Sequence, residues 1–194
     1  MSMLRIAVVL ALFSIAAALA QPGASTPSPA ARSMERKLEH LERNADSVRP
    51  DLAPTVLSED EVNAYLQSGA VELPGGVQRV RLEGTPGVVR ADARVDFDQI
   101  THSSRSMNPL LALFSGVHQV QVATHAYGER GVGHVHVDKV FLDGVEVPQV
   151  ALQFFVDRYI KPKHPEIGID SRFQMPERID SAVVGRHQVT LEQK

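Results

Sequence analysis

The feature that most constrains the fold of this chain is a strict alternation of apolar and charged side chains between residues 88 and 98. The apolar positions are Val89, Ala91, Ala93, Val95 and Phe97, and arginine or aspartate occupies each position between them. Because successive side chains of a strand point to opposite faces, this pattern predicts an antiparallel strand with one buried and one solvated face. Val80 and Leu82 alternate with charged residues before a turn at residues 84–87, so the two segments together predict a hairpin.

Further strands are expected from turn residues that separate apolar segments. Residues 118–127 and 132–142 flank a turn bounded by Gly128 and Gly131, and Asp143-Gly144 marks a tight turn before residues 145–147. Residues 178–184 and 187–192 flank a turn at Gly185-Arg186. These segments predict an α+β fold with an antiparallel sheet of about six strands.

Two helices are expected before the sheet. Apolar residues between positions 33 and 48 recur at spacings of three and four, which is typical of an amphipathic helix. Ser58 and Glu61 have the spacing of a capping box, so a second helix should run from residue 59 to about 67 and end at Gly69. We assign the carboxylates of its first turn to helix capping and not to catalysis.

A third helix is expected between Pro148 and Pro162. Residues 148–160 are apolar on almost every side, and proline suits the first turn of a helix and the position after its end. A helix that is apolar all round is normally buried. This segment therefore predicts a long apolar helix packed against the sheet.

The N-terminal 32 residues have the composition of a leader and a spacer. Residues 1–20 combine Arg5, an apolar run and small residues at Ala18 and Ala20, which predicts a signal peptide; an uncleaved anchor is the alternative. Residues 21–32 are rich in Pro, Ser and Ala and predict a disordered spacer. We expect residues 33–194 to form one α+β domain, with an amphipathic helix at 33–50 and the sheet and helix core at 55–192. The leader predicts an exported protein of the periplasm or cell envelope.

Several kinds of chemistry are excluded or receive no support. The chain has no cysteine, which excludes disulfides, thiolate metal sites and cysteine nucleophiles. We find no catalytic or phosphate-binding motif, so we assign no catalytic residue and no cofactor, and we do not expect an enzyme. The net charge of −3 offers no basic excess for binding nucleic acid.

One cluster of histidines invites a metal hypothesis. His134, His136 and Asp138 share one face of an expected strand, and His125 lies across the expected hairpin. Imidazole and carboxylate ligands suit zinc or copper. The alternative, which we prefer, is that these residues form the solvated face of the strand, so we assign no metal ligand.

A short apolar segment follows Asn108 and Pro109. Leu110, Leu111 and Phe114 lie within it, and Gly116 ends it. We interpret this segment as core filling. The alternative is a surface patch that enters a membrane or covers a cavity.

Three stretches resemble a known family. They are residues 55–66 (TVLSEDEVNAYL), residues 140–148 (VFLDGVEVP) with the apolar segment after them, and residues 173–191 (FQMPERIDSAVVGRHQVTL). They are similar to elements of bacterial envelope proteins with a tubular lipid-binding (TULIP-like) architecture, including the LmeA-type phospholipid-binding group. The resemblance implies a curled antiparallel sheet wrapped on a helix, with an apolar groove for acyl chains, and it carries no catalytic residues.

We therefore expect an exported protein that binds a lipid or another apolar ligand between sheet and helix. The expected partner is a lipid or a membrane surface, and no protein partner is assigned. Two alternatives stay open, which are a structural or scaffolding envelope protein without a ligand and a metal-binding protein. The side chains expected to line the ligand site are apolar and come from the two apolar segments: Leu110, Leu111, Phe114, Leu152, Phe154, Phe155 and Tyr159.

Overall fold

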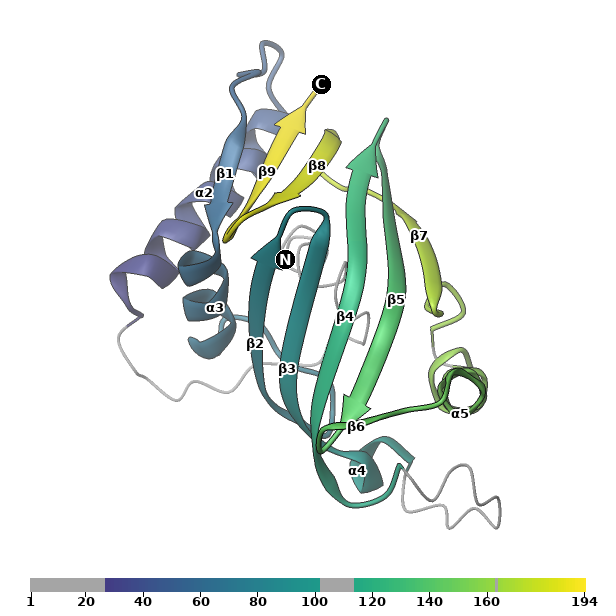
Figure 1. Ribbon diagram of the computed structural model, residues 1–194. Helices are drawn as coiled ribbons and strands as arrows, with labels where there is room; N and C mark the ends of the chain where they lie inside the picture. Colours follow the sequence, from purple (N-terminus) through teal and green to yellow (C-terminus); the bar gives the residue numbers. More distant parts are fainter. Residues whose placement is uncertain (1–26, 102–113, 163) are drawn as a thin grey trace.

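The computed structural model describes residues 27–101, 114–162 and 164–194 of the chain (Figure 1). Its helices and strands follow one another in the order α2 (Pro29–Ala45), β1 (Thr55–Ser58), α3 (Glu59–Gln67), β2 (Val77–Thr85), β3 (Val88–Asp96), α4 (Phe97–Thr101), β4 (Val117–Glu129), β5 (Val132–Leu142), β6 (Val145–Glu146), α5 (Gln149–Phe155), the π-helix η2 (Val156–Ile160), β7 (Asp170–Gln174), β8 (Ile179–Gly185) and β9 (Gln188–Gln193). The predicted leader lies outside the described residues. None of the described helices is long and apolar enough to cross a membrane.

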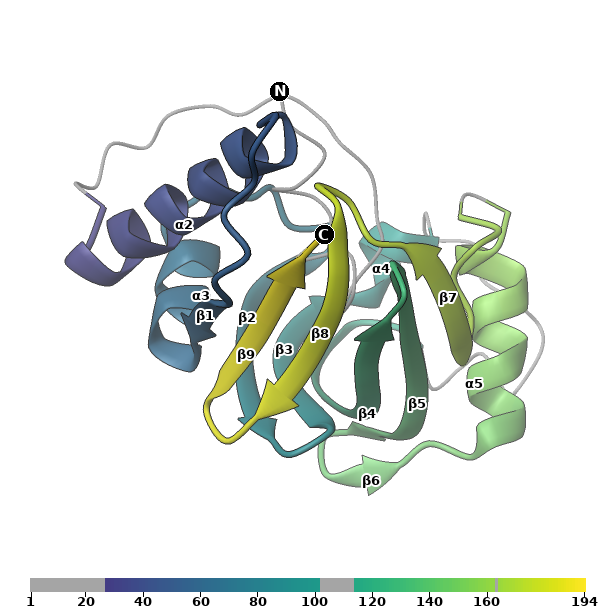
Figure 2. The same ribbon diagram turned by 90° about the horizontal axis from the view of Figure 1, so that it is seen from above.

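The strands form one antiparallel sheet, and the prediction of an α+β fold with N-terminal helices is confirmed. The main path runs β1-β9-β8-β4-β3-β2, while β5 lies beside β4 and in turn pairs with β6 and β7. The three predicted hairpins, β2–β3, β4–β5 and β8–β9, are all present. Figure 2 shows α2 and α3 at one end of the sheet and α5 at the other.

Within the described residues the sheet has nine strands, where the apolar segments and turns of the sequence predicted about six. The sheet is not curled, so the architecture implied by the family resemblance is wrong in this respect. Strand β4 pairs with β3 as far as His125 and then pairs with β8 at Tyr127 and Gly128. The β8–β9 hairpin and β1 therefore extend the sheet beyond the end of β3. The two short strands β1 and β7 lie in segments where no strand was predicted.

The expected long apolar helix is also absent. Helix α5 has seven residues and is followed by a π-helix of five. Only Ala151 and Phe155 of α5 are buried, whereas Val150 is 67% and Phe154 42% exposed. The segment buries one face only, so an apolar composition on every side did not mean burial on every side.

Helix α2 begins earlier than predicted. Ser28 caps it by accepting a hydrogen bond from the Ala31 amide, and the helix starts at Pro29, inside the segment expected to be a spacer. Met34, Leu38 and Leu41 of the predicted apolar stripe are fully covered, and with residues of β1, β8 and β9 they form a second buried cluster beside the main core. The helix ends at Ala45 and not near residue 50, and Val48, the last apolar residue of the predicted stripe, is 97% exposed.

Helix α3 protects the outer edge of strand β2. The Asn63 side chain donates to the carbonyl of Leu82 at 2.8 Å and accepts from its amide at 2.7 Å, and Glu59 accepts from the Gly84 amide at 3.0 Å. These side chains take the place of a further strand. An exposed strand edge is an aggregation hazard, and here polar groups of a helix satisfy it.

The predicted capping box of α3 is confirmed, and it also joins α3 to α2. The Glu61 carboxylate accepts a hydrogen bond from the Ser58 amide, and it also accepts from the side chains of Ser33 and Lys37 of α2 at 2.7 Å each. Burial alone would raise the pKa of the Glu61 carboxyl, but the hydrogen bonds from Lys37, the Ser58 backbone and Ser33 lower it to about 2.

Candidate functional site

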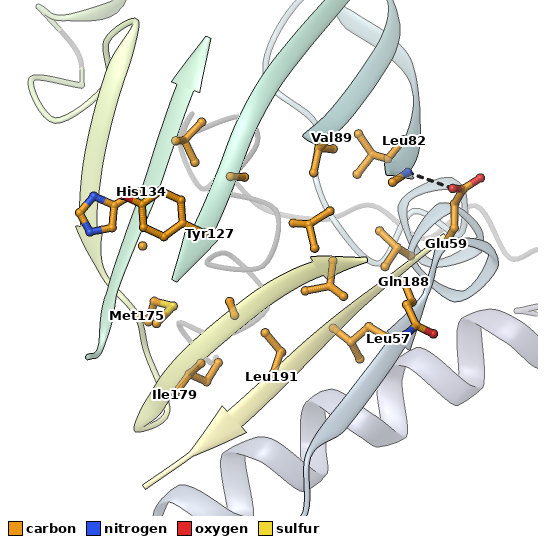
Figure 3. Close-up of a pocket in the computed structure, with 18 of the residues that line it drawn as sticks. Leu57, Glu59, Leu82, Val89, Tyr127, His134, Met175, Ile179, Gln188 and Leu191 are labelled. Atoms are coloured by element: carbon orange, nitrogen blue, oxygen red, sulfur yellow. Dashed lines mark hydrogen bonds between the residues drawn. The ribbon is translucent and has the colours of Figure 1, made fainter. Parts of the chain in front are cut away.

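An apolar pocket of about 140 Å³ lies between two parts of the sheet (Figure 3). One wall comes from β3, β4 and β5, and the other from β1, β8 and β9. Most side chains of these walls are aliphatic: Leu57, Val89, Ala126, Val135, Ile179, Ala182, Val184, Val189 and Leu191. An apolar space of this volume holds a group of about six carbon atoms.

The pocket exists because small side chains meet where the two parts of the sheet join. Val89, Ala126 and Val184 form a buried cluster of their own, with Val135 and Val189 packed against it. Larger side chains fill the two larger clusters: leucine and phenylalanine contribute to the main core, and leucine, methionine and tyrosine contribute to the second cluster. Valine and alanine do not reach far enough across the gap to close it, which leaves space lined by methyl groups.

Two glycines shape one end of the pocket. A Cβ at Gly133 would lie 2.4 Å from the Phe173 ring, and a Cβ at Gly128 would lie 2.5 Å from the Met175 sulfur. Phe173 and Met175 therefore pack directly on the backbone of β5 and β4, and both are half-buried. These two side chains form an apolar end to the pocket that small movements of a ring and a thioether can widen.

The opposite end of the pocket is polar. Glu59 lines it (Figure 3), and its carboxylate accepts from the Gly84 amide. The same carboxylate lies 2.8 Å from the His187 Nδ1 atom. Desolvation opposes ionisation of Glu59, but the hydrogen bonds from His187 and Gly84 outweigh it and hold the pKa below its usual value. The pocket thus runs from an apolar end to an ionised carboxylate.

The residues predicted to line a ligand site lie elsewhere. Phe114 and Phe155 stack with ring centroids 4.3 Å apart, and Leu152 and Tyr159 pack against the same main core cluster. Phe154 points outward from α5. Leu110 and Leu111 lie outside the described residues. None of the described members of this set lines the apolar pocket.

Sequence reasoning missed the pocket residues because they come from distant strands. Val89, Ala126 and Leu191 each appear in the sequence as an ordinary inward position of a separate predicted strand, and Leu57 lies in a segment where no strand was predicted. The one available signal was the run of small inward residues near the ends of β4 and β5, namely Ala126, Gly128 and Gly133. Small residues on the inward face indicate where a core is thinly filled.

The residues of the metal hypothesis do not converge on one point in the structure. Asp138 binds His125 at 2.8 Å, and His136 binds Asp170 at 2.5 Å, while the His134 ring stacks on Tyr127. The hydrogen bond to Asp170 raises the pKa of His136. Across residues 27–101, 114–162 and 164–194, no three histidine or carboxylate side chains are grouped as a metal ion would need.

Comparisons of this chain with protein-family models, with curated proteins and with solved structures found no match.

Proposed function

We propose that this protein is an exported envelope protein that binds an apolar ligand, with the end of an acyl chain or an aromatic ring in the pocket between the two parts of the sheet. The observation that carries the proposal is the unfilled space of about 140 Å³ lined by Val89, Ala126, Val184 and their neighbours. The leader-like residues 1–20 support the exported location.

The size of the pocket limits the ligand. Transfer of one methylene from water to an apolar site contributes about 0.8 kcal/mol, so six buried carbons contribute roughly 5 kcal/mol before the costs of association. This is enough to select an apolar group and too little to hold a whole lipid by its tail alone. The rest of the ligand must lie outside the pocket.

The test is a titration with the neutral fluorescent probe N-phenyl-1-naphthylamine. The variant Ala126→Leu places added carbons in the pocket, since Ala126 is 8% exposed and lines it. The matched control is Ala123→Leu, the same change on the same strand, where the side chain lies on the opposite face beside Arg90. Thermal unfolding of all three proteins checks that the variants are folded.

We expect the parent and Ala123→Leu to bind the probe alike and Ala126→Leu to bind it at least tenfold more weakly. Equal binding by all three folded proteins, or no binding by the parent, would contradict the proposal. In the second case the alternative of a structural envelope protein without a ligand would replace it.

A further inference from the structure

Strand β7 leaves one edge of the sheet without a backbone partner. It pairs with β5 along one side only and lies at the end of the sheet away from β1 and β2 (Figure 1). Ile169 and Met175, the residues on either side of β7, direct their backbone hydrogen bonds towards β5 and the turn before it. Because successive residues of a paired strand direct these groups to opposite sides, the N–H and C=O groups of Asp170, Arg172 and Gln174 point away from β5. Within the described residues, these backbone groups form no hydrogen bond on the open side.

The edges of the sheet at β1 and β2 are, by contrast, closed by helix side chains. At β2, Asn63 and Glu59 of α3 take the place of a further strand. At β1, Lys37 of α2 donates to the Val56 carbonyl at 2.6 Å, and the capping box of α3 uses the Ser58 amide. A row of unpaired backbone groups is a template for pairing with another chain. Strand β7 offers such a template, and β1 and β2 do not.

The side chains of β7 restrict which strand can add to it. Asp170 and Arg172 are both exposed, and Arg172 forms no ion pair or hydrogen bond with another residue in the described ranges. The Asp170 carboxylate binds His136 through its Oδ1 atom, which leaves Oδ2 able to accept a further hydrogen bond. Opposite charges directly across from each other stabilise a pair of antiparallel strands, and like charges destabilise it. The added strand therefore needs a cation opposite Asp170 and an anion opposite Arg172.

A second copy of β7 meets this requirement. When a two-fold axis passes between Ser171 and its copy, antiparallel pairing places Asp170 of each chain opposite Arg172 of the other. Both residues direct their backbone groups to the open edge, so each pair can exchange two backbone hydrogen bonds. An axis at Arg172 would place two guanidinium groups opposite each other, and an axis at Phe173 would place Asp170 opposite Pro176, which has no N–H. The charges and the proline thus favour the register centred on Ser171.

We infer that the β7 edge pairs with the β7 edge of a second copy of this chain, so that two sheets join into one across a two-fold axis at Ser171. The contact is one strand of five residues, which is smaller than the interface of a stable dimer, so monomer and dimer exchange. Asp170 and Arg172 do not line the apolar pocket, and the inference is therefore independent of the proposed function.

The experiment is sedimentation equilibrium of the protein over a wide range of concentration, with charge reversals at the two paired positions. Arg172→Asp or Asp170→Arg alone places like charges in both cross-strand pairs, and we expect either change to weaken dimerisation at least tenfold. An equimolar mixture of the two single variants should recover the dimer, because each pair between the two different chains again joins opposite charges. The double variant Asp170→Arg/Arg172→Asp should dimerise like the parent for the same reason.

Two controls match these changes. Arg186→Asp makes the same charge change at an exposed position in the turn between β8 and β9. His136→Gln removes the hydrogen bond to Asp170 and leaves the charges of Asp170 and Arg172 unchanged. Both controls should dimerise within twofold of the parent, and thermal unfolding checks that every variant is folded.

Amide hydrogen exchange tests whether the contact uses this strand edge. The Arg172 amide points to the open edge, so we expect it to exchange at least tenfold more slowly in concentrated than in dilute protein, while the Arg186 amide is unchanged. A parent that stays monomeric at every concentration would overturn the inference and leave the edge to a strand of a different protein. A dimer that neither reversal weakens, or that the mixture of single variants does not restore, would overturn it as well.

Discussion

The buried Glu61 carboxylate should make the stability of the fold depend on pH in the acid range. Its pKa is about 2 in the folded chain against an ordinary value of 4.5, because Lys37, Ser33 and Ser58 donate hydrogen bonds to it. A carboxyl whose pKa is lower in the folded state stabilises the fold above its unfolded pKa. That contribution is lost as the pH falls from about 4.5 towards 2. The full difference corresponds to ~3 kcal/mol, of which ~2 kcal/mol is lost between pH 7 and pH 3.

Urea unfolding of the parent and of Glu61→Gln at pH 7 and pH 3 measures this contribution. The parent should lose ~2 kcal/mol more between the two pH values than Glu61→Gln does, because glutamine does not titrate. The matched control is Asp60→Asn, an exposed position in the same helical turn, which should keep the pH dependence of the parent. If Glu61→Gln and the parent lose the same free energy of unfolding between pH 7 and pH 3, the ionised Glu61 carboxylate does not stabilise the contact between α2 and α3.

Three further predictions concern single positions. Asn63→Ala should lower the free energy of unfolding by ~2 kcal/mol, measured by urea unfolding, because both backbone groups of the β2 edge lose a buried partner; a loss below ~0.5 kcal/mol would contradict this. Gly133→Ala should destabilise by ~1–3 kcal/mol in the same assay, since the new methyl would meet the ring packed on β5; an unchanged stability would refute that packing. Asp143 raises the pKa of His118 through a 2.6 Å hydrogen bond. This bond therefore stabilises the fold below pH 6.5, and its contribution disappears as the pH rises through the raised pKa. Asp143→Asn should lower the His118 pKa in an NMR titration, and an unchanged pKa would exclude this bond in solution.

Local patterns predicted most of the strands and one helix terminus well. The alternation around Ala91 and Ala93 reports directly which face of β3 is buried, and the capping box at Ser58 and Glu61 is a contact between residues three apart. Such features need no knowledge of the rest of the fold. They account for the confirmed hairpins and for the start of α3.

The parts that sequence reasoning missed depend on distant residues. Strand β1 exists because Val56 and Leu57 pair with Thr190 and Val189 at the other end of the chain, and four residues alone carry little strand signal. The apolar pocket likewise needs β1, β4 and β8 to be placed before its lining is known. In α5 the exposed Phe154 has the same composition signal as the buried Phe155, so only packing distinguishes them.

The most direct test of the ligand-binding claim is to locate a bound apolar group by NMR. Methyl-labelled protein would be mixed with unlabelled octyl glucoside below its micelle concentration, and isotope-filtered NOEs from the octyl chain would be recorded. We predict NOEs to the methyl groups of Val89, Val184 and Leu191, which line the pocket. NOEs confined to Val150 and its neighbours on the exposed face of α5, or no NOEs while the detergent is in excess, would contradict the account.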